Sequence, residues 1–319
     1  MMLEKCIIFN LSANPLLTKK IAELLNVPLG SVDLTHFADG EIMARSLDSV
    51  RGKSVYIIQS MSPPSSEKIM ELLIFIDSIK KAKAKEINLV SPYYGYSRQD
   101  RIARPREPIS ARLIADLLKT VGVSHVITFD LHTPQIQGFF SCPVDNLSPT
   151  HLFAAYYLEK LKDLKINSED VVVVSPDHGS VHRGRDLASS LPNSQLAIVD
   201  KRRPSPNEAE VISIVGDVKN KVCIIIDDII DTGKTIKAST THLFAAGASL
   251  VLVAATHGIF SKGAINLLKE VGVSDIVVTN SIEKEMNGVN IISIAEVIAQ
   301  AIEYNEEGLS LPPELLAFY

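Results

Sequence analysis

Short apolar runs rich in β-branched residues, alternating with helical stretches, constrain the fold of this 319-residue chain more than any other feature. The runs are residues 55–58, 87–90, 126–129, 171–174, 222–226, 250–254 and 276–279. The segment from Ile69 to Ile79 carries apolar residues at the i, i+3, i+4 and i+7 positions of a core-facing helix. Strands and helices that alternate in this way form parallel sheets covered on both faces, so we expect an α/β fold.

Three segments of the first half recur in the second half of the chain. Residues 50–60 match 218–228 at an offset of 168, 84–95 match 247–258 at 163, and 117–124 match 267–274 at 150. Self-similarity of this kind indicates duplication of one α/β unit. We expect two domains, at 1–147 and 148–304, with the tail 305–319 packed back on the first domain.

The fall in offset from 163 to 150 places 13 extra residues in the first half, between Gly95 and Leu117. This insertion is polar and rich in arginine; it contains Arg98, Gln99, Asp100, Arg101, Arg104, Arg106 and Glu107. Because loops that connect rigid elements often carry the binding residues, we expect ligand contacts here. The two halves therefore share a framework but differ in their chemistry.

The chain carries 32 Lys and Arg against 37 Asp and Glu, a net charge of −5. Neutralising a nucleic-acid backbone needs a basic surface, so this balance argues against a nucleic-acid polymer as a partner. The longest uncharged apolar run, 243–256, is too short to cross a bilayer, and no membrane partner is expected. Cys6, Cys142 and Cys223 form no CxxC pair, which favours a reducing compartment and a cytoplasmic location.

The segment 223–236 combines an apolar strand, two carboxylates and a glycine-containing loop. Asp227 and Asp228 end the strand, and Gly233 precedes a helix that carries Thr235. Ligands bind at the carboxyl ends of parallel strands, and the N–H groups at a helix start suit a phosphate. The carboxylates are then placed to accept hydrogen bonds from sugar hydroxyls.

Two other interpretations compete with this phosphate loop. A Walker A loop is excluded, because Asp228 stands where that motif requires glycine. The alternative that Asp231 only caps the following helix stays open.

The segment resembles the phosphoribosyl-diphosphate motif shared by phosphoribosyltransferases and ribose-phosphate diphosphokinases. Further motifs follow one another along the chain: FADGE at 37–41, PYYGYSRQDR at 92–101, REPIS at 106–110, DLH at 130–132, QIQGFF at 135–140, PVDNL at 143–147 and SPDHG at 175–179. On these motifs the chain resembles the ribose-phosphate diphosphokinase (phosphoribosyl-diphosphate synthase) family, from about residue 5 to about residue 303.

The resemblance implies two duplicated phosphoribosyltransferase-like domains and one reaction. ATP and ribose 5-phosphate would give AMP and 5-phosphoribosyl 1-diphosphate, because the sugar's C1 hydroxyl attacks the β-phosphorus of ATP. The implied cofactor is Mg2+, which neutralises the charge that spreads over the transferred group. The family also implies a homo-oligomer, a hexamer, in which the loop bearing Phe37 reaches the adenine bound by a neighbouring subunit.

The resemblance also assigns roles to individual residues. Lys201 and Arg203 match the catalytic lysine and arginine of the family's catalytic loop. The ATP-binding positions are Phe37, Asp39, Gly40, Glu41, Arg98 and Gln99. The ribose 5-phosphate positions are Arg203, Asp227, Asp228, Asp231, Thr232, Gly233, Lys234 and Thr235. His132 and Asp177 match magnesium-associated positions, although a histidine also suits the ATP phosphates.

Several positions depart from the family's pattern, among them Lys234 and Ser180. Lys234 stands where the phosphate loop usually has a second glycine, and a positive φ there would strain the backbone by about 1 kcal/mol. Ser180 replaces a common glycine after residues 177–179. Two other functions stay open: a non-catalytic regulatory homologue of such an enzyme, and a phosphoribosyltransferase. The latter would need neither the nucleotide motif at 96–100 nor a doubled domain.

Overall fold

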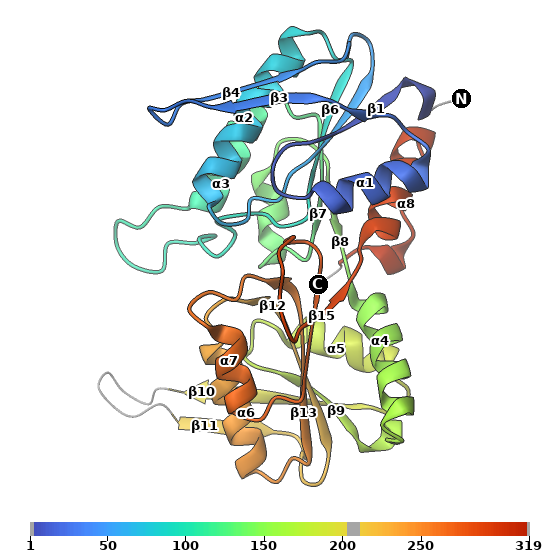
Figure 1. Cartoon of the computed structure of the whole chain (residues 1–319). Helices are drawn as coiled ribbons and strands as arrows, with labels where there is room; N and C mark the ends of the chain where they lie inside the picture. The colour runs from blue at the N-terminus through green and yellow to red at the C-terminus, as the bar shows by residue number, and fades with distance from the viewer. Residues whose placement is uncertain (1–2, 203–210, 318–319) are drawn as a thin grey trace. The chain divides into compact units, whose positions relative to one another are not determined.

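The computed structural model describes residues 3–202 and 211–317. The chain folds as two compact units (Figure 1). Unit 1 comprises Met1–Ser148, Asn280–Lys284 and Ser293–Tyr319, and unit 2 comprises Pro149–Thr279 and Glu285–Ile292. Within the described ranges, no helix is long and apolar enough to span a membrane.

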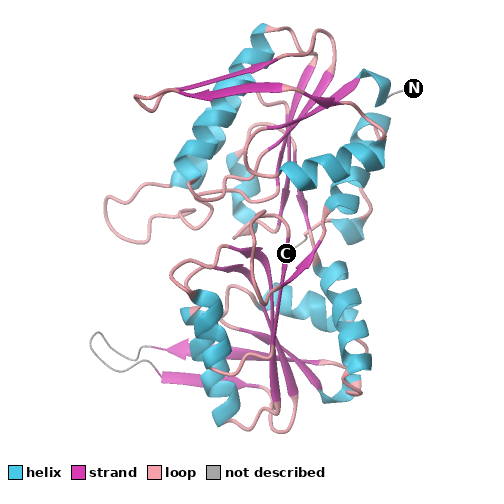
Figure 2. Ribbon diagram, in the orientation of Figure 1, coloured by secondary structure: helices cyan, strands magenta, loops and turns pink. Residues whose placement is uncertain are grey.

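Unit 1 is built on a 6-stranded parallel sheet in the order β2-β1-β5-β6-β7-β8. The strands are β1 (Cys6–Asn10), β2 (Leu29–Gly30), β5 (Ser54–Ile58), β6 (Glu86–Ser91), β7 (His125–Phe129) and β8 (Val144–Leu147). The helices α1 (Pro15–Leu25), α2 (Ser65–Lys81), α3 (Ser110–Val121) and α8 (Ala295–Glu307) lie on both sides of the sheet (Figure 2). A separate antiparallel hairpin, β3 (Val32–His36) and β4 (Ile42–Ser46), packs on α2.

Apolar residues on both faces explain why these strands are central. Val55 and Ile57 on one face of β5, and Tyr56 and Ile58 on the other, are fully buried. Helix α2 places Leu72 and Ile76 against the core that contains Val55 and Ile57. Burying one such side chain stabilises the fold by about 1.5–3 kcal/mol. The helix expected from Ile69 to Ile79 is confirmed as the central part of α2.

Unit 2 is built on a 7-stranded sheet in the order β11-β10-β9-β12-β13-β14-β15. The strands are β9 (Val171–Ser175), β10 (Gln195–Arg202), β11 (Val211–Val215), β12 (Val222–Ile230), β13 (Leu250–Gly258), β14 (Asp275–Thr279) and β15 (Asn290–Ile292). Among the described strand pairs of this 7-stranded sheet, only β10 and β11 run antiparallel. The helices are α4 (Thr150–Asp163), α5 (Val181–Ser190), α6 (Lys234–Ala245) and α7 (Ala264–Glu270).

The two sheets repeat one strand order. β1-β5-β6-β7-β8 of unit 1 corresponds to β9-β12-β13-β14-β15 of unit 2, and the matched sequence segments fall on equivalent elements. The extra residues of the first half form the long loop between β6 and α3. The predicted α/β fold with two duplicated, mainly parallel sheets is therefore confirmed.

Helix α8 belongs to unit 1, whereas the predicted range 148–304 places it in the second domain. The contacts of this helix give the reason: α8 packs on α1, and Glu306 accepts hydrogen bonds from Ser54 Oγ and Tyr56 OH of β5, each 2.7 Å. A buried tyrosine hydroxyl needs such a partner, which fixes α8 to this sheet. The tail then pairs with β8, where the Ala317 N–H donates to the Asn146 carbonyl (2.8 Å).

Candidate active site

The loop from β12 to α6 forms a helix start that suits a phosphate. β12 extends to Ile230, so Asp227 and Asp228 lie inside this strand near its carboxyl end. Gly233 is the N-terminal cap residue of α6. The first N–H groups of a helix have no partner within it and point toward whatever anion binds there.

Gly233, rather than Asp231, occupies the N-cap position of α6, which the alternative interpretation of the sequence gave to Asp231. Its carboxylate accepts a hydrogen bond from Ser261 Oγ, and its carbonyl accepts one from the Ser261 N–H (3.0 Å). The cap position belongs to Gly233. Asp231 therefore anchors the loop to the segment that follows β13.

The strain expected at Lys234 is absent. The residue with a left-handed backbone is Gly233, at φ 73°. Lys234 begins α6, and its φ is not positive. One glycine before the helix is sufficient for the turn, and lysine adopts helical backbone at little cost. Lys234 is exposed at this helix start.

Asp227 is a buried carboxylate held by two donors. Its Oδ1 accepts hydrogen bonds from Ser180 Oγ (2.7 Å) and from the Asp228 N–H (3.0 Å). Burial, and then the nearby charge of Asp228, raise the pKa of Asp227 well above its usual range, while the hydrogen bond from Ser180 opposes the rise. Such a pair of carboxylates favours a ligand that brings hydroxyl donors or positive charge.

Ser180 also contacts the predicted magnesium position. Its N–H donates to Asp177 Oδ1 (3.1 Å), so one residue bridges Asp177 and Asp227. Asp177 follows β9 and Asp227 lies on β12, which pairs with β9 in parallel. The carboxyl ends of adjacent parallel strands thus bring both carboxylates to one edge of the sheet.

The predicted catalytic Lys201 lies near the end of β10. The backbone of Lys201 belongs to this strand and pairs with Ile212 of β11, whereas Arg203 lies outside the described residues. Immediately before Lys201, the buried Asp200 contacts His178 Nε2 through Oδ1 at 2.9 Å. This contact joins the loop after β9 to the strand end that leads into the predicted catalytic segment.

The first group of predicted ATP-binding residues forms a tight, exposed turn between β3 and β4. The Phe37 N–H donates to the Glu41 carbonyl (2.8 Å), and the Gly40 N–H donates to the Phe37 carbonyl (2.9 Å). Asp39 Oδ1 accepts from the Glu41 N–H (3.0 Å), and Gly40 has a φ of 93° that residues with a Cβ rarely adopt. Phe37 is 49% exposed, so this aromatic residue is accessible to a ligand.

The second group, Arg98 and Gln99, lies exposed in the loop between β6 and α3. Gln99 Oε1 accepts from Ser110 Oγ (2.6 Å), and Asp100 accepts from Thr133 Oγ1 (2.6 Å). Thr133 follows His132, so this hydrogen bond joins the arginine-rich insertion to the loop that carries His132. The predicted ATP positions thus lie in unit 1, and the ribose 5-phosphate positions in unit 2.

Sequence reasoning missed some residues that position these groups. Ser180 appeared only as a departure from glycine, and its hydroxyl bridge to Asp227 has no sequence signal. Asp130 has a left-handed backbone (φ 41°), which a short polar residue tolerates, at the turn between β7 and His132. Thr133 and Asp100 lie in neighbouring motifs, but only the fold pairs them.

Comparison with known proteins places these observations in one family. Residues 6–122 match the family described as the N-terminal domain of ribose phosphate pyrophosphokinase, and residues 169–311 match the phosphoribosyl synthetase-associated domain. The chain is 48% identical over 299 residues to a ribose-phosphate pyrophosphokinase of Bacillus subtilis (strain 168), with 92% of each chain covered. The chain belongs to the ribose-phosphate pyrophosphokinase family.

Other relatives agree with this assignment. A ribose-phosphate pyrophosphokinase of Bacillus caldolyticus is 49% identical over 299 residues, covering 92% of this chain and 93% of the relative. The crystal structure of phosphoribosylpyrophosphate synthetase from Mycobacterium smegmatis has a TM-score of 0.88 at 41% identity, covering 95% and 99% of the two chains. As a member of the ribose-phosphate pyrophosphokinase family, the protein is a diphosphotransferase.

The carboxylates of unit 2 fit a magnesium ion. Asp177, Asp227 and Asp228 supply hard oxygen donors. Burial, and then the charge of Asp228, raise the pKa of Asp227, and a divalent cation beside the pair would favour its charged form. His132 is a less usual ligand for magnesium and suits a phosphate oxygen better.

Proposed function

We propose that this protein transfers the diphosphoryl group of ATP to ribose 5-phosphate, giving 5-phosphoribosyl 1-diphosphate and AMP. The C1 oxygen of the sugar forms a bond to the β-phosphorus, the bond from that phosphorus to the oxygen bridging to the α-phosphate breaks, and the hydroxyl proton is released. The observation that carries the proposal is the pair Asp227 and Asp228 beside the helix start at Gly233. Together they match a polyhydroxylated ligand that ends in a phosphate.

The ribose 5-phosphate roles follow from this arrangement. The turn formed by Asp231, Thr232, Gly233, Lys234 and Thr235 would bind the 5-phosphate through N–H groups at the start of α6. Asp227 and Asp228 would accept hydrogen bonds from the ribose hydroxyls, with Ser180 fixing the orientation of Asp227. Lys201 and Arg203 would stabilise the charge on the transferred group, since placed cations are the main catalytic device in phosphoryl transfer.

The ATP roles rest on unit 1. Phe37 would stack on adenine, and Asp39, Gly40 and Glu41 would shape the turn around the nucleoside. Arg98 and Gln99 would bind ATP from the insertion, because a planar guanidinium stacks on bases and pairs with phosphates. His132 would contact the ATP phosphates or the metal.

Mg2+ is the cofactor that the carboxylate set suits, and Asp177 of unit 2 would hold it. His132 of unit 1 stays a second predicted magnesium-associated position. When bound, the ion would neutralise phosphate charge during transfer. A homo-oligomer, predicted as a hexamer, and a cytoplasmic location both stay predictions. The latter rests on the free cysteines, which are Cys6, Cys142 and Cys223.

The decisive experiment is AMP formation from ATP and ribose 5-phosphate, assayed with Mg2+ and again after its removal by a chelator. We expect AMP and phosphoribosyl diphosphate in equal amounts, and no product without the metal. A protein that instead consumes phosphoribosyl diphosphate in the presence of a nucleobase would be a phosphoribosyltransferase. A protein inert in both assays would be a regulatory homologue.

Replacing Ser180 with alanine is expected to weaken ribose 5-phosphate binding. The hydroxyl donates to Asp227 Oδ1 at 2.7 Å, and its loss removes a charge-assisted hydrogen bond that orients this carboxylate. We expect the KM for ribose 5-phosphate to rise about tenfold, while the KM for ATP stays unchanged. Steady-state kinetics with each substrate varied in turn measures both.

Two variants control for the Ser180 prediction. Ser180→Thr keeps the hydroxyl and should retain most of the affinity. Ser189→Ala removes an exposed hydroxyl that bonds only its own helix, at the Arg185 carbonyl, and should change neither KM. Equal KM values for Ser180→Ala and the unsubstituted protein would show that Ser180 does not orient Asp227.

Replacing Gly233 with alanine is expected to damage the phosphate turn. The residue has φ 73°, and an added Cβ would lie 3.3 Å from Ala264 Cβ. The backbone strain costs about 1 kcal/mol or more, and relieving it shifts the N–H groups that bind phosphate. We expect at least a tenfold rise in the KM for ribose 5-phosphate and a lower Tm.

Lys234→Ala is the matched control for Gly233, because Lys234 lies in the adjacent helical turn without a positive φ. We expect this variant to keep the Tm of the unsubstituted protein. Thermal unfolding without ligands separates backbone strain from loss of a binding group. A Tm for Gly233→Ala equal to that of Lys234→Ala would contradict the strain argument.

A further inference from the structure

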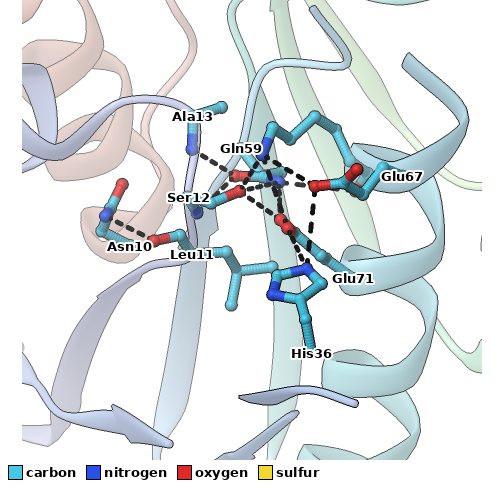
Figure 3. A network of polar contacts seen from close by, with 9 residues as sticks. Asn10, Leu11, Ser12, Ala13, His36, Gln59, Glu67 and Glu71 are labelled. Atoms are coloured by element: carbon cyan, nitrogen blue, oxygen red, sulfur yellow. Dashed lines mark hydrogen bonds and ion pairs between the residues drawn. The ribbon is translucent and has the colours of Figure 1, made fainter. Parts of the chain in front are cut away.

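Glu71 of α2 is a completely buried carboxylate outside the predicted substrate positions. Its Oε2 accepts hydrogen bonds from Ser12 Oγ and from Gln59 Nε2 (2.9 Å). Its Oε1 lies 3.2 Å from His36 Nε2 and 3.4 Å from Lys68 Nζ. Figure 3 shows Ser12, His36 and Gln59 gathered around Glu71. A buried charge with this many donors is well compensated and holds its neighbours in fixed positions.

The contacts of Glu71 extend to three further parts of unit 1. Gln59 follows β5, and its Oε1 accepts from the N–H groups of Ser12 (3.2 Å) and Ala13 (3.0 Å) in the loop after β1. Lys68 Nζ donates to Ser12 Oγ at 2.6 Å. His36 is the last residue of β3. We call the set Ser12, His36, Gln59, Glu67, Lys68 and Glu71 the Glu71 network.

A metal ion does not explain this network. His36, Glu67 and Glu71 offer ligand atoms within 4.8 Å of one another, as a cation site would. However, the Lys68 ammonium lies 3.4 Å from Glu71 Oε1 and 3.8 Å from Glu67 Oε1. The ammonium thus takes the place that a metal ion would take, and a second cation beside it would be repelled.

His36 links the network to the turn predicted to bind ATP. Its Nε2 lies 3.2 Å from Glu71 Oε1 and 3.7 Å from Glu67 Oε1, so the ring nitrogen faces two carboxylate oxygens. The next residue is Phe37, where the exposed turn begins. Because the Phe37 N–H donates to the Glu41 carbonyl and the Gly40 N–H donates to the Phe37 carbonyl, the turn is closed by its own hydrogen bonds. Its orientation is therefore set at the two strand ends from which it projects.

We propose that the Glu71 network, through His36, is a positioning device that orients the turn 37–41 for ATP. The inference rests on the proposed role of this turn in ATP binding. The hairpin forms its own two-stranded sheet, so the main sheet of unit 1 does not fix it through strand pairing. Its apolar residues Leu34 and Ala44 pack on the core, and His36 adds a polar contact to α2 at the base of the turn. Apolar packing is non-directional, whereas a close contact with a buried carboxylate that is itself held by other donors fixes the position of His36 at one point.

The test is His36→Ala, because His36 has a side chain 44% exposed and its removal leaves the core intact. We expect the KM for ATP to rise about fivefold to tenfold, with kcat and the KM for ribose 5-phosphate unchanged. His36→Arg, whose guanidinium can donate to Glu71 and Glu67, should recover most of the ATP affinity. Arg45→Ala is the matched control, because it removes an exposed ion pair with Asp33 (2.9 Å) on the same hairpin and leaves the contact to α2 intact.

Phe37→Ala separates this proposal from the proposed function. An unchanged KM for ATP in Phe37→Ala would contradict the assignment of the turn to ATP, and with it the present inference. A raised KM in Phe37→Ala with an unchanged KM in His36→Ala would overturn only the role of the network. An equal rise in the KM for ATP in Arg45→Ala would also overturn the role of the network, because any weakening of the hairpin would then be enough to raise this KM.

Discussion

Replacing Lys201 with alanine is expected to lower kcat for AMP formation by about 10²–10³-fold, the loss seen when one preorganised group that stabilises developing charge is removed. Lys201 lies where β10 leads into the predicted catalytic segment, and its neighbour Asp200 is fixed by His178 at 2.9 Å. We expect the positive charge of Lys201, at this strand end, to act mainly when charge spreads over the transferred group. We therefore expect the two KM values to change less than kcat.

The measurement is initial-rate AMP formation with saturating ATP, ribose 5-phosphate and Mg2+. Lys162→Ala on α4 is the matched control, because it removes an exposed lysine remote from the strand end in sequence. Lys201→Arg tests the geometry, since a planar guanidinium keeps the charge but not the point-like ammonium. Full activity of Lys201→Ala would remove Lys201 from the catalytic machinery.

Replacing Asp227 with asparagine should reduce activity and increase stability at the same time. The ionised carboxylate is proposed to accept hydrogen bonds from ribose hydroxyls. Losing two charge-assisted bonds of about 1.5–3 kcal/mol each lowers kcat/KM for ribose 5-phosphate by about 10²-fold or more. Asparagine retains an oxygen that can accept from Ser180 Oγ and the Asp228 N–H, so the local fold should persist.

The stability gain follows from the direction of the pKa shift at Asp227. Burial and the charge of Asp228 raise its pKa in the folded protein above the unfolded value of about 3.9. Between these two pKa values the folded state binds more protons than the unfolded state, so the free energy of unfolding falls as pH rises. Asparagine carries no charge, so the free energy of unfolding of the variant does not fall in this way as pH rises. Asp227→Asn should therefore have the higher Tm at neutral pH, and the difference should shrink as pH falls toward 3.9.

Thermal unfolding without Mg2+ or substrate, followed across pH, measures the effect. Asp217→Asn is the matched control, because Asp217 is an exposed aspartate in the turn between β11 and β12. Its variant should show no comparable rise in Tm at neutral pH. Burying the ionised carboxylate, which is proposed to bind the ribose hydroxyls, is expected to lower the stability of the folded protein. A Tm for Asp227→Asn below that of the unsubstituted protein at neutral pH would contradict this expectation.

Local sequence patterns predicted the strands and helices well, because they depend on residues close together in the chain. The stripe from Ile69 to Ile79 indicated α2, and the β-branched run 222–226 indicated β12. The run did not predict that β12 continues to Ile230, since pairing with β13 extends this strand through Asp227 and beyond. Likewise, the glycine pattern suggested strain at Lys234, whereas the fold places the positive φ at Gly233.

Contacts between distant residues could not be predicted in the same way. The sequence offers no reason to join His36 to Glu71, or Ser180 to Asp227, because both pairs meet only when separate elements pack. The placement of α8 in unit 1 has the same origin: Glu306 contacts Ser54 and Tyr56, about 250 residues earlier in the chain.

The sequence by itself determined that this protein has a duplicated α/β framework and resembles one family of diphosphotransferases, since periodicity and ordered motifs are written along the chain. Only the tertiary structure decided how the functional side chains are held. Ser180 bridges the carboxylates of two adjacent strands, and Lys68 supplies an internal cation beside Glu71. The physical reason is that hydrogen bonds and charge compensation depend on distances of a few ångströms between atoms, and folding alone brings those atoms together.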